Sequence, residues 1–278
     1  ILEECTEGFT FAHPSGKEED NTVRHGPSFI DDQIDLVSLP TQEAPTSIPI
    51  CQEKLQLWQD LLNVSGGDLQ LIKCSFGLLQ YSFTHSKQGD KATLKNKNDN
   101  PGDIYLQPFN QNLCPTKLKR LDHDTPEQYL GVFINMRGTW EKEHDERKTR
   151  HIELAETIKS SSITRHQAYM IHSIQYRPAI SYILHHTRFT TAQCKELDSP
   201  IVNSLLPKMG FNRNTPRKVV FGPRKYGGLA FTHIETEQLK LQLCYYVKAL
   251  RKGGLQSEEY RTLTAAYQQF LGVGTQFF

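Results

Sequence analysis

The sequence predicts an α+β fold in which a strand-rich N-terminal part is followed by a mostly helical C-terminal part. Up to about residue 138, apolar and polar residues alternate in short runs separated by turn residues, which is typical of strands. From Trp140 onward, apolar residues recur at helical spacing, flanked by residues typical of helix starts and ends. We therefore expect two regions, 1–138 and 139–278.

Composition narrows the class of protein. The chain has 278 residues and a formal net charge of +1, so it is long enough for one large domain or two smaller ones and carries no global field that would steer it to nucleic acid or membrane. No apolar run reaches the length of a membrane span, and no basic-then-apolar leader opens the chain, so we expect no membrane partner. The first residue is Ile1 rather than Met, as expected of a fragment.

The cysteines and histidines give no sign of a metal site. Six cysteines lie far apart without a C-x-x-C pair, which argues against a zinc ribbon and against a dense disulfide framework. Scattered thiols are typical of a reducing compartment, so we expect an intracellular protein, with nucleus and cytoplasm left open. The histidines form no H-E-x-x-H motif, and a helix would point His185 and His186 in different directions.

Several elements are expected in the first region. Residues 9–12 and a polar turn at 15–18 precede the acidic stretch 29–32, which resembles a hairpin entering a sheet. Two prolines predict a loop over 41–49. Residues 51–64 carry apolar residues at helical spacing, and Ser65-Gly66-Gly67 is expected to end that helix. Alternation predicts strand over 69–73, over 76–83 and over 129–134, whereas the polar stretch 87–103 is expected to be a mobile loop.

The second region contains stronger helix signals. The densely charged segment 141–160 carries a narrow apolar stripe, and Thr164 and Thr190 each begin a capping-box pattern. Pro178 is expected to kink or divide the helical segment around it. A last helix is expected over 235–252, ended by Gly253-Gly254. Its apolar face is assigned to the core: Leu239, Leu243, Tyr246, Val247 and Leu250.

Two adjacent carboxylates, Asp31 and Asp32, lie in the stretch Phe29-Ile30-Asp31-Asp32 between two short apolar segments. This pattern predicts a tight strand-turn-strand with the acids at its tip. Such acids can hold divalent metal ions against phosphates if a third carboxylate comes from elsewhere. On these residues alone an acidic surface turn is the better interpretation, because Asp is a favoured turn residue.

A local excess of positive charge lies between Asp198 and Glu235, where the chain has no acid. The basic residues there are Lys208, Arg213, Arg217, Lys218, Arg224 and Lys225, interleaved with Phe211, Phe221, Tyr226 and Phe231. Basic side chains offset backbone phosphates while aromatic rings stack on bases, so the segment is a candidate nucleic-acid contact. An ordinary basic loop anchored by its aromatic residues explains the pattern equally well.

Four motifs in a fixed order resemble reverse transcriptases of retroelements. Phe29-Ile30-Asp31-Asp32 is similar to the Y/F-x-D-D motif, Gly67–Lys73 to the next palm motif, and Tyr129-Leu130-Gly131-Val132 to the Y-L-G segment after it. Leu206–Arg213, Val220–Pro223 and Tyr226–Leu229 are similar to a region downstream of the palm. The resemblance spans about Phe9 to Ile234 and implies a palm-type antiparallel sheet remnant with a packed helix over 1–138, followed by a thumb-like or connection-like helical region over 139–278.

The resemblance also implies roles for individual residues. Asp31 would be the principal ligand of two Mg²⁺ (or Mn²⁺) ions and Asp32 a secondary one, so that the metals activate the primer 3′-hydroxyl and stabilise the leaving pyrophosphate. Lys73 would donate a proton to that pyrophosphate; without the resemblance it is a solvated lysine. Tyr129, Leu130 and Gly131 would lie near the primer terminus, or else in a buried strand. The implied partners are an RNA template and a DNA primer.

The family's first palm carboxylate, its glycine-containing loop and its fingers have no counterpart here. We therefore expect a C-terminal part of a reverse transcriptase that has no polymerase activity alone and needs the missing N-terminal palm and fingers portion as a partner. Two alternatives remain: a nucleic-acid-binding module that uses the segment from Lys208 to Lys225, and a non-functional remnant of a retrotransposon.

Overall fold

A computed structural model describes residues 9–11, 14–17, 22–24, 28–29, 32–33, 47–86, 89–95, 102–108 and 114–273, and within them the chain is α+β. Contacts divide the chain into two units, the first formed by Ile1–Thr125 with Gly253–Phe278 and the second by Pro126–Lys252. Each unit is described by itself. The expected division into palm-like and thumb-like regions near residue 139 rests on the resemblance to reverse transcriptases and stays a prediction.

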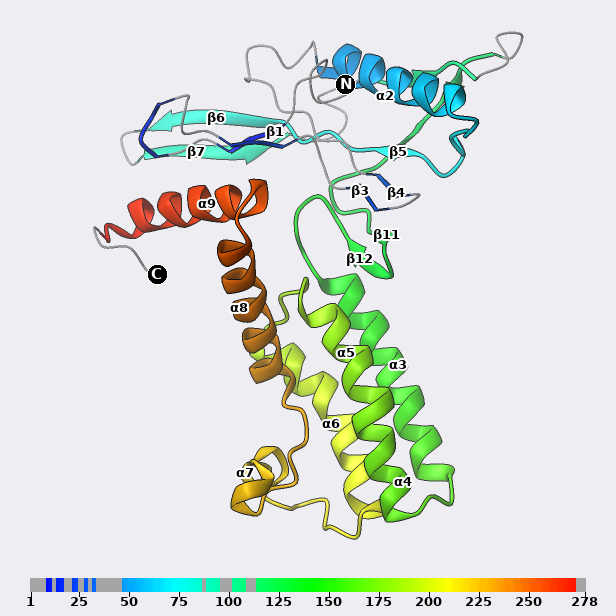
Figure 1. Ribbon diagram of the computed structural model, residues 1–278, viewed down its shortest axis with the longest axis vertical. Helices are drawn as coiled ribbons and strands as arrows, with labels where there is room; N and C mark the ends of the chain where they lie inside the picture. Colours follow the sequence, from blue (N-terminus) through cyan, green and yellow to red (C-terminus); the bar gives the residue numbers. More distant parts are fainter. Residues whose placement is uncertain are drawn as a thin grey trace. The chain divides into compact units, whose positions relative to one another are not determined.

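The described strands of the first unit pair two by two (Figure 1). They are β1 (Phe9–Phe11) with β2 (Thr22–Arg24), β3 (Ser28–Phe29) with β4 (Asp32–Gln33), β6 (Tyr81–Ser86) with β7 (Gly89–Leu94), β8 (Tyr105–Leu106) with β9 (Thr116–Lys117), and β5 (Ser75–Phe76) with β10 (Lys119–Arg120). The β5–β10 pair is parallel and the others are antiparallel. The palm-type sheet therefore stays a prediction.

A small core in the first unit forms beneath α2 (Ser47–Val64). Ile104, Leu106 and Leu118 are buried, and Ile48 and Leu55 of α2 pack against them. The predicted helix is thus confirmed, although it begins earlier than expected: residues 47–49, including Pro49, lie in its first turn rather than in a loop, since proline needs no hydrogen-bond partner there. Gly66 ends it with φ +86°, as its lack of a Cβ permits.

Three predictions in the strand-rich region are wrong. Residues 71–73 form a turn, with the Lys73 N–H donating to the Gln70 carbonyl at 2.8 Å. Residues 77–80 lie outside the strands on either side of them. In the polar stretch assigned to a loop, 89–94 pair with β6, from Tyr81 opposite Leu94 to Ser86 opposite Gly89. Backbone pairing here overrides a composition poor in apolar residues.

The predicted strand over 129–134 is a hairpin in the second unit. β11 (Glu127–Tyr129) pairs with β12 (Val132–Ile134) across a two-residue turn. Leu130 and Gly131 both have positive φ, +48° and +81°, as a type I′ turn requires. Glycine adopts this conformation without strain, and a leucine with φ +48° is uncommon. The Y-L-G segment is therefore the tip of a hairpin.

The rest of the second unit is helical. Its helices are α3 (Glu141–Ser160), α4 (Arg165–Met170), a π-helical stretch η4 (Ile171–Tyr176), α5 (Arg177–Leu184), α6 (Thr191–Lys208), α7 (Arg217–Phe221), a 3₁₀ turn η5 (Arg224–Tyr226) and α8 (Ile234–Lys252). Helix α3 lies against α6, and α5 lies against α8 (Figure 1). In the first unit, a further helix that the sequence did not predict, α9 (Leu255–Leu271), contacts β1 and β2.

Local chemistry explains where these helices begin and change. Thr164 and Thr190 both form complete capping boxes, in which the threonine accepts the backbone N–H of Gln167 or Gln193 and that glutamine accepts the threonine N–H. Pro178 does not divide its helix. Because proline has no N–H and its ring collides with the preceding turn, the backbone widens into the π-helical stretch just before α5.

The core of the second unit is apolar and continuous. Fully buried members include Ile180, Ile183, Leu197, Ile201, Leu205 and Leu206. The assignment of the α8 stripe to this core is wrong for Leu239 and Leu243, which are 61% and 53% exposed. α8 docks instead through Ile234, Gln238 and Leu241, and Gln238 holds the Phe189 backbone with two hydrogen bonds of 2.9 and 3.1 Å. None of the helices described is long and apolar enough to cross a membrane.

Candidate nucleic-acid interface

The basic segment runs from Lys208, the last residue of α6, to the start of α8 at Ile234. It is an ordered structure braced by backbone hydrogen bonds. After α6 the Phe211 N–H donates to the Leu206 carbonyl at 2.9 Å across Gly210, which has φ +83°. Farther on, the N–H groups of Leu229 and Phe231 donate to the carbonyls of Val219 and Val220 at 2.9 and 3.0 Å. These bonds tie the returning chain to α7.

Gly222 and Gly228 let the backbone before η5 and the backbone after it approach each other closely. A Cβ on Gly228 would overlap the Gly222 carbonyl, so only glycine fits. The Ala230 N–H donates to that same carbonyl at 2.9 Å, and Gly227 adopts φ +80°. The turn over 223–227 is thereby closed at its base.

Most of the basic side chains of this segment face solvent. Arg213, Arg217, Lys218, Arg224 and Lys225 are exposed. Arg217 donates to Asn203 Oδ1 at 3.0 Å. Lys208 differs, because its Nζ donates to the Ser161 carbonyl at 2.6 Å and the residue is half-buried. Lys208 therefore ties the end of α6 to the end of α3.

The aromatic residues of the segment divide into two kinds. Phe231 is buried, and Phe221 is half-buried with its ring edge-on to His233 at 4.7 Å. These two anchor the segment, as the interpretation as an ordinary loop expects. Phe211 and Tyr226 are 39% and 77% exposed. The rings available for contact with a ligand are therefore those of Phe211 and Tyr226.

Helix α4 contributes residues that the sequence analysis did not assign to this surface. The guanidinium of Arg224 lies 4.3 Å from the centre of the Tyr169 ring, within cation–π distance. The guanidinium of Arg165 lies against Gly210, where a Cβ would come within 2.9 Å of its Nη2. The capping-box pattern at Thr164 predicts helix α4. Nothing in the neighbouring sequence indicates that α4 contacts Gly210 and Arg224, some fifty positions farther along the chain.

The tip of the β11–β12 hairpin is held by the helices. Tyr182 donates its hydroxyl to the Leu130 carbonyl at 2.7 Å, and Arg147 donates to the Gly131 carbonyl at 2.9 Å. Glu143, which is fully buried, accepts the Phe133 N–H at 2.8 Å and also pairs with Arg147. Tyr129 is half-buried and Leu130 is exposed at the tip, so these residues are not the interior of a buried strand.

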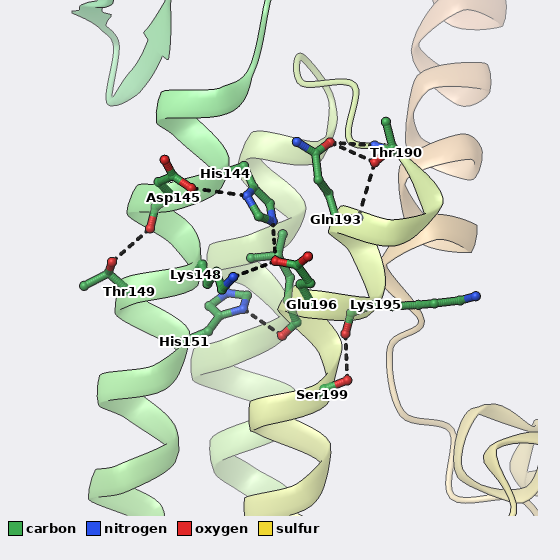
Figure 2. A network of polar contacts seen from close by, with 11 residues as sticks. His144, Asp145, Lys148, Thr149, His151, Thr190, Gln193, Lys195, Glu196 and Ser199 are labelled. Atoms are coloured by element: carbon green, nitrogen blue, oxygen red, sulfur yellow. Dashed lines mark hydrogen bonds and ion pairs between the residues drawn. The ribbon is translucent and has the colours of Figure 1, made fainter.

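A polar network joins the first half of α3 to the first half of α6, as Figure 2 shows. Lys148 donates to Glu196 at 2.6 Å, and this hydrogen bond lowers the pKa of Glu196 and raises that of Lys148. The His144 ring lies between Asp145 and Glu196, at 3.6 and 3.9 Å. A ring nitrogen of His151 contacts the Leu197 carbonyl at 3.1 Å. The contacts named here all lie on α3 and α6, so we assign this network a structural role.

The acids of the Y/F-x-D-D motif are only partly described. Asp31 lies outside the described residues, and Asp32 begins β4 opposite Phe29. Lys73 is exposed in its turn. Among the residues that the structure describes, no group of three or more His, Cys, Asp or Glu side chains could hold a metal ion. The magnesium site and the roles of these three residues stay predictions.

No model of a known protein family matches this chain, and no curated protein matches it.

Proposed function

We propose that the second unit binds nucleic acid through the surface formed by the exposed basic residues of 213–225 together with Arg165 and Tyr169 of α4. The observation that carries the proposal is the exposure of five basic side chains on a braced segment in which Tyr226 is also exposed. Positive side chains on a fixed backbone can follow a chain of phosphates and release its counterions. Because the whole chain has a net charge of only +1, the attraction to phosphates is local to this surface.

Charge reversal tests the proposal. In the pair Arg217→Glu and Arg224→Glu, we expect affinity for a labelled RNA or DNA oligonucleotide at low salt to fall at least about tenfold, since two phosphate contacts are lost. The matched control is Lys195→Glu with Lys248→Glu, which changes the net charge equally at exposed positions on other parts of α6 and α8. Equal losses in both pairs, or no binding by the unchanged protein, would remove the proposal.

We further propose, on the resemblance given above, that this surface belongs to the thumb-like region of a reverse transcriptase-like chain. Asp32, the second acid of the motif, pairs with Phe29 in the antiparallel β3–β4 pair. We expect no primer extension by this chain alone with Mg²⁺ or Mn²⁺, and nucleic-acid binding that is indifferent to Asp31→Asn. Extension that Asp31→Asn abolishes would contradict that expectation and establish a polymerase.

A further inference from the structure

Two side chains of α4 join separate parts of the basic segment into one surface. Arg165 and Tyr169 are one helical turn apart, about 6 Å along the axis, and so lie on the same face. Arg165 lies against Gly210 at the end of α6, and Tyr169 lies beneath Arg224 of η5. The exposed ring of Phe211 follows Gly210 directly, and that of Tyr226 ends η5. Both rings therefore belong to parts of the chain that α4 contacts.

The η5 turn presents an aromatic ring and cations in fixed positions. Lys225 Nζ lies 4.6 Å from the centre of the Tyr226 ring, and Tyr226 is 77% exposed as a residue. The cation–π contact with Tyr169 holds the planar guanidinium of Arg224, which can donate two parallel hydrogen bonds to one phosphate. Because the base of the turn is closed at Gly222 and Gly228, little conformational entropy remains to be lost on binding.

We infer that this surface binds an unpaired nucleic-acid strand, with a base stacked on Tyr226 and the adjoining phosphate held by Arg224; the inference rests on the proposed function. A base inside a duplex is already stacked on both faces and cannot cover an exposed ring. An unpaired base can, and stacking on an aromatic side chain stabilises binding with little dependence on sequence. Exposed rings beside cations thus favour a single strand over a duplex.

The test compares single strands with a duplex on the full chain. Labelled RNA and DNA strands of about 12 nucleotides, and a duplex of the same length, are titrated by fluorescence anisotropy at one salt concentration. We expect tighter binding of the single strands. Tyr226→Leu should weaken their binding about 5- to 150-fold, the range for loss of one stacked base, and leave duplex binding unchanged. Tyr226→Phe keeps the ring and should bind as the unchanged protein does.

Tyr267→Leu is the control, because it removes another exposed tyrosine ring, on α9 of the first unit, and should have no effect. Equal affinity for single strands and duplex, together with no effect of Tyr226→Leu, would overturn the inference. In that case the charge-reversal pair would still lose binding, and the proposed function would stand. Absence of binding to any probe would remove the proposed function itself. The RNA and DNA arms show which kind of strand is preferred.

Discussion

Asp198 is a buried carboxyl group in the helical unit. It is 6% exposed on α6, its Oδ2 accepts the Ile234 N–H at 3.2 Å, and its Oδ1 has no hydrogen-bond partner in the described structure. Burial raises its pKa from 3.8 to about 7. The folded protein therefore keeps a proton that the unfolded chain has lost. The resulting stability is fully present below about pH 4 and is lost as the pH rises through 7.

Two buried histidines act in the opposite direction. Burial lowers the pKa of His151 and of His172 from 6.5 to about 4. Between these values the unfolded chain binds both protons and the folded protein does not. Their stability is full above pH 6.5 and is lost as the pH falls through 4. Between pH 4 and 6.5 these two histidines therefore outweigh Asp198 by one proton, so the three groups together contribute a fall in stability on acidification of about 1.4 kcal/mol per pH unit.

Asp198→Asn removes the opposing group and should make the protein more sensitive to acid. Since the histidines then act alone, the slope should approach about 2.7 kcal/mol per pH unit between pH 4.5 and 6.5. Urea unfolding at these two pH values, followed by circular dichroism, measures the difference. An unchanged pH dependence in Asp198→Asn would show that this carboxyl group is ionised in the folded protein.

At the scale of elements, the buried ion pair of Glu143 with Arg147 supports the β11–β12 hairpin. Glu143→Ala leaves the Phe133 N–H without its acceptor and removes the carboxylate partner of Arg147, so we expect a loss of about 3–5 kcal/mol in unfolding free energy. Glu146→Ala is the matched control on the same helix. It breaks an i,i+4 pair with Arg150, which is half exposed, and should cost about 0.5 kcal/mol. Equal losses in the two variants would contradict this account.

Elements defined by neighbouring residues could be predicted from the sequence, and those defined by distant partners could not. The helix over 141–160 and both capping boxes depend on side chains within one turn, and their predictions are confirmed. The docking face of α8 depends on Gln238 meeting the Phe189 backbone, a contact between residues far apart in the chain. Assigning the buried face of a helix from its apolar residues cannot favour a glutamine over Leu239 for the core.

The candidate interface shows the same limit. The run of basic residues without acids is visible in the sequence, and so are its four aromatic residues. Which rings are anchors and which are exposed follows from packing, which buries Phe231 and leaves Tyr226 in solvent. The contribution of Tyr169 requires α4 to lie beside η5. The hairpin at Leu130-Gly131 is hidden in the sequence because Tyr129 and Leu130 join with the apolar residues of β12 into what resembles one strand.

For the whole molecule, the two units should respond separately to a protease. The second unit, Pro126–Lys252, has its own apolar core, and Lys252 is followed by Gly253 and Gly254, both exposed with positive φ. Brief digestion with a protease of broad specificity should leave a resistant fragment close to 126–252, identifiable by mass spectrometry, because cleavage needs exposed, unbraced backbone. A resistant fragment that extends well past both boundaries would contradict the division.

The salt dependence of oligonucleotide binding tests the central claim most directly. For a single strand, the logarithm of the association constant falls with the logarithm of salt concentration, with a slope of about −0.7 for each phosphate contact. Between about 50 and 200 mM salt, we expect Arg217→Glu with Arg224→Glu to make this slope shallower by about 1.4, and Lys195→Glu with Lys248→Glu to leave it unchanged. Identical slopes for the unchanged protein and both variants would contradict an interface formed by the segment between α6 and α8.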